Sequence, residues 1–185
     1  MPTSGQLDTS WGPISFELAD DVAPESCQAF IECILHGEYT GGQFFRTVRS
    51  DNDQGHPQID VVQAHASDEK PARKVRHEST QRTALRHQEG TLSLPRNAPG
   101  SGTGAGFFIC LRDTPALDHG GKRNPDGEGF AAFGRITEGM DIIRRIHSAP
   151  CQTGGPDPYL EGQLLLAPVV IQTASVTRLD LIPPT

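Results

Sequence analysis

The stretch FGRITEGMDIIRRI, residues Phe133 to Ile146, joins a predicted strand to a predicted helix. The apolar residues of its first part belong to a strand candidate that runs from Phe130 to Ile136. Its second part repeats apolar residues at three-residue spacing, which predicts a one-faced helix over Glu138 to His147. The residues that mark this helix are Met140, Ile143 and Ile146. A helix of this kind needs an apolar surface to pack on, and short strands on either side would provide one.

The N-terminal part of the chain repeats the combination of strand and helix. Residues from Ile14 to Leu18 alternate between apolar and polar, which is the period of a half-buried strand. Pro24 suits the first turn of a helix, and Gly37 suits its end. The apolar residues between them follow a helical spacing: Cys27, Phe30, Ile31, Ile34 and Leu35. We therefore expect a second one-faced helix here.

The remaining strand candidates are short and separated by turn-rich segments. They are Gln43 to Val48, Ile59 to Ala64, Gly90 to Leu94, Phe107 to Leu111 and Val169 to Leu179. Many strands with only two helices predict an antiparallel barrel or sandwich. We expect one domain over residues 1–185, with residues 1–11 as a flexible N-terminal tail, and long polar loops at residues 49–58 and 116–129.

Composition excludes several classes of function. Sixteen Lys and Arg against 23 Asp and Glu residues give a formal net charge of −7, which argues against nonspecific binding to nucleic acid or to anionic membranes. No apolar run approaches the roughly 20 residues of a membrane-spanning helix. The four cysteines form no C-x-x-C pair, so we expect free thiols in the cytoplasm. An export signal removed before Met1 is the alternative.

Three stretches together resemble the cyclophilin family of peptidyl-prolyl isomerases. They are FFRTV at Phe44 to Val48, GFFICL at Gly106 to Leu111, and FGRITEGMDIIRRI. The resemblance covers about residues 14–179, and the segment LDHGGKRNPDGEGFAAFGR is more similar to a bacterial branch of the family. It implies a mostly β fold: a closed eight-stranded antiparallel barrel capped by two α-helices, one over each end.

The resemblance also implies a chemistry that needs no nucleophile, metal or cofactor. Rotation about an X–Pro bond crosses a barrier of ~18–20 kcal/mol, because amide resonance is lost at the twisted midpoint. A catalyst must hold the proline ring and stabilise the twisted amide. Arg46 matches the family's catalytic arginine, whose guanidinium stays charged at any working pH. The alternative for Arg46 is a solvated arginine at a strand edge.

Further residues are assigned to substrate binding by the same match. Gln63 corresponds to the active-site glutamine, although an ordinary strand glutamine is an equal alternative. Phe108 corresponds to the floor of the proline pocket and Leu117 to its wall. Phe45 and Val61 complete the predicted contacts on the two strands that carry Arg46 and Gln63.

The chain departs from the family pattern at several of these positions. Gly106 stands where a glutamine is common, and Pro95 and Arg96 replace an Ala-Asn pair. Arg96 could take over the asparagine's role as a donor to the substrate backbone. Phe130 occupies the histidine position, where it would add apolar area. Ala116 replaces a tryptophan that helps the family hold cyclosporin, so we expect poor inhibition by such cyclic peptides.

Three functions are compatible with these residues. The first is an active prolyl isomerase, monomeric, acting on proline-containing peptides and unfolded proteins. The second is a catalytically weak proline-peptide binding module or holdase, and the third is a structural scaffold. We expect no metal, because the histidines lack ligand spacing. We also expect no phosphate site, because the glycine-rich segment at residues 100–106 does not open a helix.

Overall fold

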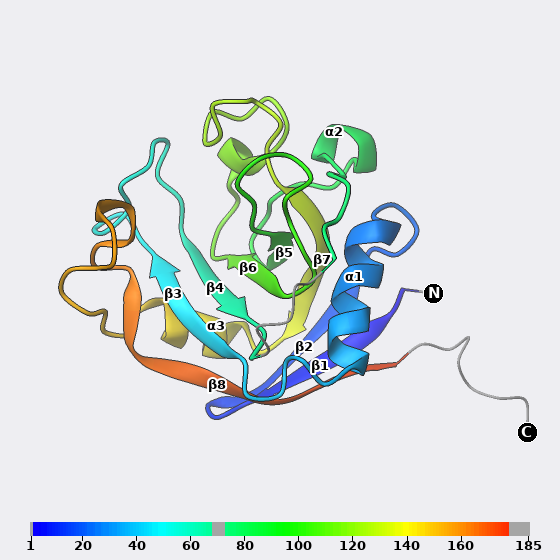
Figure 1. The fold of residues 1–185 in the computed structure, drawn as a ribbon, viewed down its shortest axis with the longest axis horizontal. Coiled ribbons are helices and arrows are strands. Elements are labelled where there is room, and N and C mark those ends of the chain that lie inside the picture. The colour runs from blue at the N-terminus through cyan, green and yellow to red at the C-terminus, as the bar shows by residue number, and fades with distance from the viewer. Residues whose placement is uncertain (1, 68–72, 178–185) are drawn as a thin grey trace, which may run out of the picture.

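Eight antiparallel strands close into a barrel in the computed structural model, which describes residues 2–67 and 73–177 (Figure 1). Around the barrel the strands follow the order β1-β2-β7-β5-β6-β4-β3-β8. Their bounds are β1 Ser4–Thr9, β2 Gly12–Leu18, β3 Gln43–Val48, β4 Val61–His65, β5 Thr91–Leu94, β6 Gly106–Cys110, β7 Ala131–Glu138 and β8 Leu164–Thr177. The helices are α1 Pro24–Leu35, α2 Thr80–Thr83 and α3 Met140–His147, with 3-10 turns at Pro115–Leu117 and Pro158–Leu160. The predicted mostly β barrel is confirmed.

Residues 4–9 form part of the barrel, so the prediction of a flexible tail over residues 1–11 is wrong for the described residues of that range; residue 1 lies outside them. Strand β1 pairs with β2 on one side and with β8 on the other, and it thereby closes the barrel. Leu7 is its one large apolar residue and is fully buried. At Gly5 a Cβ atom would lie 2.3 Å from the Phe16 ring, so the strand needs glycine there. A strand with only one large apolar residue shows no alternating pattern, so β1 could not be predicted from the sequence.

The other predicted elements are present with shifted ends. Strand β8 begins at Leu164, five residues before the predicted start at Val169, and residues 178–179 of that prediction lie outside the described residues. Strand β4 begins at Val61 rather than Ile59. Both predicted helices form, and the four-residue helix α2 is an addition to them.

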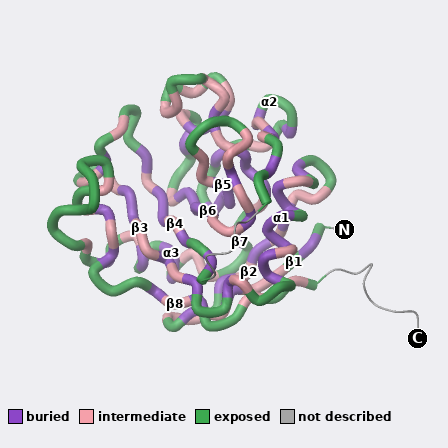
Figure 2. The backbone as a smooth tube through the Cα atoms, in the orientation of Figure 1, coloured by how far each residue is buried: buried purple, intermediate pink, exposed green. Residues whose placement is uncertain are grey.

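The barrel interior is centred on an aromatic side chain from α1. The ring of Phe30 lies 5.2–5.5 Å from four other aromatic rings, mostly in edge-on or tilted arrangements. These rings belong to Phe16, Tyr39, Phe107 and Phe133. Edge-on packing of this kind adds stability beyond the buried area itself. Figure 2 shows many exposed positions in the loops and along β8, whereas β5, β6 and much of α1 are buried.

A second apolar cluster is formed partly by the opposite faces of the same strands. Along β6, Phe107 and Ile109 point into the barrel, whereas Phe108 and Cys110 belong to the second cluster. Successive side chains of a strand point to opposite faces, so a single strand contributes to both. The other members are Val48, Ile59, Val61 and Leu117, with Phe130 packed against them. This cluster forms the base of the candidate site.

Candidate active site

A cavity of about 500 Å³ lies over the second apolar cluster. Most of the predicted site residues line it: Arg46, Val61, Gln63, Pro95, Arg96, Phe108, Leu117 and Phe130. Residues outside the predicted site set complete the lining: Val48, Ile59, Asn97, Ser101, Arg123, Asn124 and Tyr159. The cavity combines an apolar base with charged side chains at its walls.

A bulge in β3 sets the direction of Arg46. Phe44 pairs with Ala64 of β4, and Arg46 pairs with Gln63, so β3 advances two residues while β4 advances one. A β-bulge of this type re-aims the side chains around it. The extra residue is Phe45, whose ring packs against His65 at 4.7 Å. Phe45 therefore does not line the cavity, contrary to the sequence-based expectation.

The guanidinium of Arg46 is held by two amide oxygens. Its Nη1 donates to Oε1 of Gln63 over 3.0 Å. Its Nε and Nη2 both donate to Oε1 of Gln163, over 2.9 and 2.7 Å. The ring of Tyr159 lies 5.2 Å from Cζ of Arg46, within the range of a cation–π contact. Gln163 and Tyr159 come from the loop before β8 and carried no recognisable signal in the sequence.

Phe108 provides an aromatic floor. Phe130 meets it edge-on, with ring centroids 5.3 Å apart, and the buried ring of His87 stacks behind it at 6.1 Å. His87 is itself fixed by Asp118 at 2.7 Å and by Ser93 at 3.0 Å. Together with Leu117, these rings form an apolar surface suited to a proline ring.

The guanidinium of Arg96 is fully occupied within the protein. Its five N–H groups donate to the backbone oxygens of Asn97 and Gly129 and to both carboxylate oxygens of Asp126. The guanidinium also lies 5.4 Å from the centre of the Phe130 ring. Arg96 therefore has no side-chain donor left for a substrate backbone, and that hypothesis from the sequence is wrong. It anchors the loop around Gly129 and supports Phe130.

Gly106 lies beside the cavity without lining it. It is the first residue of β6, and a Cβ atom added to it would lie 3.5 Å from the Pro95 ring. The predicted substrate contact at this position is therefore not part of the cavity wall.

The two long predicted loops are joined by a buried ion pair. Arg123 donates to both carboxylate oxygens of Asp53 over 2.8 Å, and both side chains are almost completely buried. Burial raises the pKa of Asp53, but the Arg123 hydrogen bonds and the N–H groups of Gly55 and Ile59 outweigh it. The pKa of Asp53 thus lies below its ordinary value. Arg123 also reaches the hydroxyl of Tyr159, so this pair ties three loops together beside Arg46.

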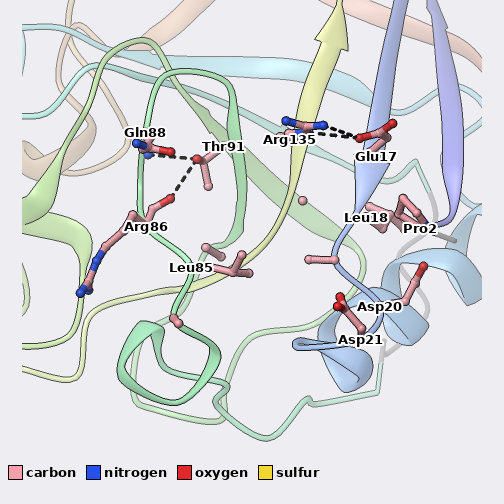
Figure 3. A pocket seen from close by; sticks show the side chains of 14 residues that line it. Pro2, Glu17, Leu18, Asp20, Asp21, Leu85, Arg86, Gln88, Thr91 and Arg135 are labelled. Carbon is pink, nitrogen blue, oxygen red and sulfur yellow. Dashed lines mark hydrogen bonds and ion pairs between the residues drawn. The ribbon is translucent and has the colours of Figure 1, made fainter.

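A larger cavity of about 770 Å³ lies elsewhere, between β2, β7 and residues 84–91 (Figure 3). Arg135 and Glu17 form an ion pair of 2.7 Å in its wall, and Asp20 accepts a hydrogen bond from the N–H of Thr3. Its described lining includes no aromatic side chain, and Arg135 is already paired with a carboxylate. The smaller cavity therefore fits proline recognition better.

Comparison with known proteins identifies the family. The model of the family described as "Cyclophilin type peptidyl-prolyl cis-trans isomerase/CLD" matches residues 5–176. The chain belongs to the cyclophilin family. Peptidyl-prolyl cis-trans isomerase cyp18 of Streptomyces antibioticus is 32% identical to this cyclophilin over 172 residues, which are 92% of this chain and 96% of the relative. Peptidyl-prolyl cis-trans isomerase A of Dickeya dadantii is 28% identical, over 93% and 83% of the two chains.

Solved structures support the fold of this cyclophilin. A Cryptosporidium parvum cyclophilin type peptidyl-prolyl cis-trans isomerase superposes with a TM-score of 0.69 at 16% identity, covering 96% of this chain and 99% of that one. The resemblance inferred from the three sequence stretches is thus confirmed, and bacterial cyclophilins are among the similar proteins. Within residues 2–67 and 73–177, no helix has the length and apolar character needed to cross a membrane.

Proposed function

We propose that this cyclophilin catalyses X–Pro rotation in the Arg46 cavity and that its substrates are proline-containing segments of flexible or unfolded proteins. The proline ring would lie on the apolar surface of Phe108, Phe130 and Leu117. Burial of a ring of this size contributes about 1–3 kcal/mol of binding. Arg46 would then act on the amide bond that precedes the ring.

The observation that carries this proposal is the set of donors that Arg46 keeps. A guanidinium has five N–H groups, and the two glutamines accept from three of them. Among the described residues, one N–H on Nη1 and one on Nη2 have no acceptor. The nitrogen of a twisted amide becomes pyramidal and accepts a hydrogen bond that the planar amide nitrogen does not. Donors aimed at it stabilise the transition state more than the ground state.

We further propose that the protein is located in the cytoplasm and is a monomer. All four cysteines are free, and Cys27, Cys33 and Cys110 are buried, which suits a reducing compartment such as the cytoplasm. Burial raises the pKa values of all three thiols, Cys33 to about 12, so they are poor nucleophiles. Sedimentation equilibrium tests the proposed monomer directly.

Exchange NMR on a short X–Pro peptide tests the assignment. Wild type is expected to accelerate cis/trans exchange, and Arg46→Ala is expected to lose about 100-fold or more, as for removal of a preorganised donor. Arg82→Ala removes an exposed arginine on α2 and serves as the matched control. Equal exchange rates for wild type and a folded Arg46→Ala would refute the role of Arg46.

Gly106 and Arg96 differ from the family pattern, and these differences favour a second candidate function, a proline-peptide binding module with weak turnover. The donors of Arg96 are taken by the protein itself, so the substrate backbone is held by fewer side chains than the family pattern offers. Peptide resonances that shift on titration without faster exchange would favour this alternative.

A further inference from the structure

We propose that Gln163 is a positioning residue for Arg46, holding the guanidinium in its working orientation while leaving its positive charge uncompensated. This inference rests on the proposed function, because it assigns a partner to the arginine that acts on the amide. It adds a residue that lies 117 positions further along the chain.

Gln163 is fixed from both ends of its amide. It is fully buried, and its Oε1 accepts from Nε and Nη2 of Arg46. Its Nε2 donates to the backbone oxygen of Asn52 over 2.8 Å. The oxygen and the nitrogen therefore have different partners, and a flipped amide would lose all three hydrogen bonds.

The backbone around Gln163 is fixed as well. Its carbonyl oxygen accepts from the N–H of Thr47 over 2.9 Å, and Leu164 is the ladder partner of Arg46 between β3 and β8. Asn52 donates from its side chain to the carbonyl oxygens of Thr47 and Gly162. The glutamine thus sits in a hydrogen-bonded frame that joins the end of β3 to the start of β8. A side chain held in this way can orient another.

The charges in the cavity explain why an amide, rather than a carboxylate, holds Arg46. Three arginines line the cavity, and two have carboxylate partners: Arg96 with Asp126 at 2.9 Å, and Arg123 with Asp53 at 2.8 Å. Within the described residues, Arg46 has no carboxylate within 4.0 Å. An amide oxygen accepts the same hydrogen bonds without cancelling the charge. The positive field at the substrate nitrogen is therefore kept.

Two substitutions separate orientation from charge. Gln163→Leu removes the acceptor, so Arg46 loses two of its three hydrogen bonds, and we expect kcat to fall about 10-fold or more with KM little changed. Gln163→Glu keeps an acceptor for Nε and Nη2, but it adds a negative charge and loses the donation to the Asn52 carbonyl. We expect a similar loss of kcat at pH 7 from this variant, since the carboxylate would offset the positive field of the guanidinium at the substrate. Gln28→Leu, at an exposed glutamine on α1, is the control and should keep the wild-type rate.

A double-mutant cycle decides whether Gln163 acts through Arg46. In the Arg46→Ala background, Gln163→Leu should cause no further loss, because the group it positions is gone. The proposal is overturned if either Gln163→Leu or Gln163→Glu keeps the wild-type kcat. It is also overturned if Gln163→Leu lowers kcat by the same factor with and without Arg46. If Gln163→Leu does not fold, Gln163→Asn replaces it in the cycle, because it shortens the side chain by only one methylene. Its loss of kcat should likewise disappear in the Arg46→Ala background.

The NMR signal of the Arg46 Nε–H keeps this test separate from the proposed function. We expect slow solvent exchange of this proton in wild type and in Gln163→Glu, and fast exchange in Gln163→Leu. Fast exchange in wild type would show that the contact does not hold in solution and would overturn the proposal. If the turnover of the wild type does not depend on Arg46, the proposed function is rejected. The contact between Gln163 and Arg46 would then have no catalytic role, even if the Nε–H proton exchanges slowly.

Discussion

Arg46 and Gln63 are direct partners across the β3–β4 ladder, and Nη1 of Arg46 donates to Oε1 of Gln63 over 3.0 Å. The bulge at Phe45, between Phe44 and Arg46, produces this register. Among the described residues, Nε2 of Gln63 has no acceptor, and Gln63 lines the cavity. Its amide N–H groups are thus available to a substrate, while its oxygen holds the arginine.

Removal of the Gln63 amide should slow isomerisation without abolishing it. Gln63→Leu deletes one hydrogen bond to a charged group, worth about 1.5–3 kcal/mol, but leaves the two bonds from Arg46 to Gln163. We expect kcat/KM for a short X–Pro peptide to fall about 10-fold, less than for Arg46→Ala. Exchange NMR on both variants and on Gln28→Leu checks the order. A larger loss in Gln63→Leu than in Arg46→Ala would contradict it.

Phe130 should contribute to affinity for the proline ring. Its ring meets Phe108 edge-on at 5.3 Å and lines the cavity, at a position that the sequence resemblance matches to the family's histidine. Phe130→Ala is expected to weaken binding of a proline peptide by about 1–2 kcal/mol, on the basis of lost apolar contact. Chemical-shift titration gives the dissociation constant. Phe130→Leu retains most of the area and should bind close to wild type; equal weakening by both variants would point to a polar role of the ring instead.

Arg96 should matter for stability through the loop that it anchors. Arg96→Met deletes the hydrogen bonds to Asp126 and to the Gly129 carbonyl, and the free energy of unfolding should fall by on the order of 2 kcal/mol. Urea unfolding measures this change. At temperatures where the variant is folded, its isomerase rate should fall far less than that of Arg46→Ala. A stable variant with a large loss of turnover would show that Arg96 does serve the substrate.

Acid should destabilise the protein in part through Asp53. The pKa of Asp53 is lowered in the folded state, so the unfolded chain takes up its proton first as the pH falls. The stabilisation is complete above the ordinary carboxyl pKa of about 4 and is lost as the pH falls through the lower folded value. Urea unfolding between pH 2.5 and 7 should show wild type more stable than Asp53→Asn at pH 7, with the gap closing below pH 4. A gap independent of pH would exclude this titration. Asp21→Asn, at an exposed carboxylate, is the control.

Cyclosporin-type cyclic peptides should inhibit this cyclophilin poorly. Ala116 lies in the 3-10 turn Pro115–Leu117, and by the sequence resemblance it replaces the family tryptophan that helps to hold the drug. Ala116→Trp should strengthen inhibition, because an indole adds a large apolar surface with one hydrogen-bond donor. An inhibition curve from the peptide exchange assay tests both chains. Nanomolar inhibition of wild type would contradict the expectation.

The sequence was most informative where one strand or helix carries the whole pattern. Alternation along Phe107 to Cys110 separated two faces of the strand, and the structure places Phe107 and Ile109 in the barrel core and Phe108 and Cys110 in the second cluster, from which Phe108 lines the cavity. It was least informative for β1, where Leu7 is the only large apolar residue and pairing on both sides supplies the order. It also misled at Phe45, because a bulge depends on the pairing of two strands and is not visible in one.

By itself, the sequence indicated strands and helices through local periodicity, and its resemblance to the cyclophilin family supplied the closed barrel and most of the predicted residues that line the cavity, because the motifs that carry this resemblance lie within short continuous stretches. Only the tertiary structure decided how Arg46 is held. Its contacts with Gln63 and Gln163 span 17 and 117 residues, and Arg123 meets Asp53 across 70. Asp53, Arg123 and Gln163 lie in loops without a periodic pattern, so their side chains become partners only when the fold brings these loops together. In the folded protein every N–H group of the Arg96 guanidinium has an acceptor, whereas Arg46 keeps two N–H groups without an acceptor among the described residues.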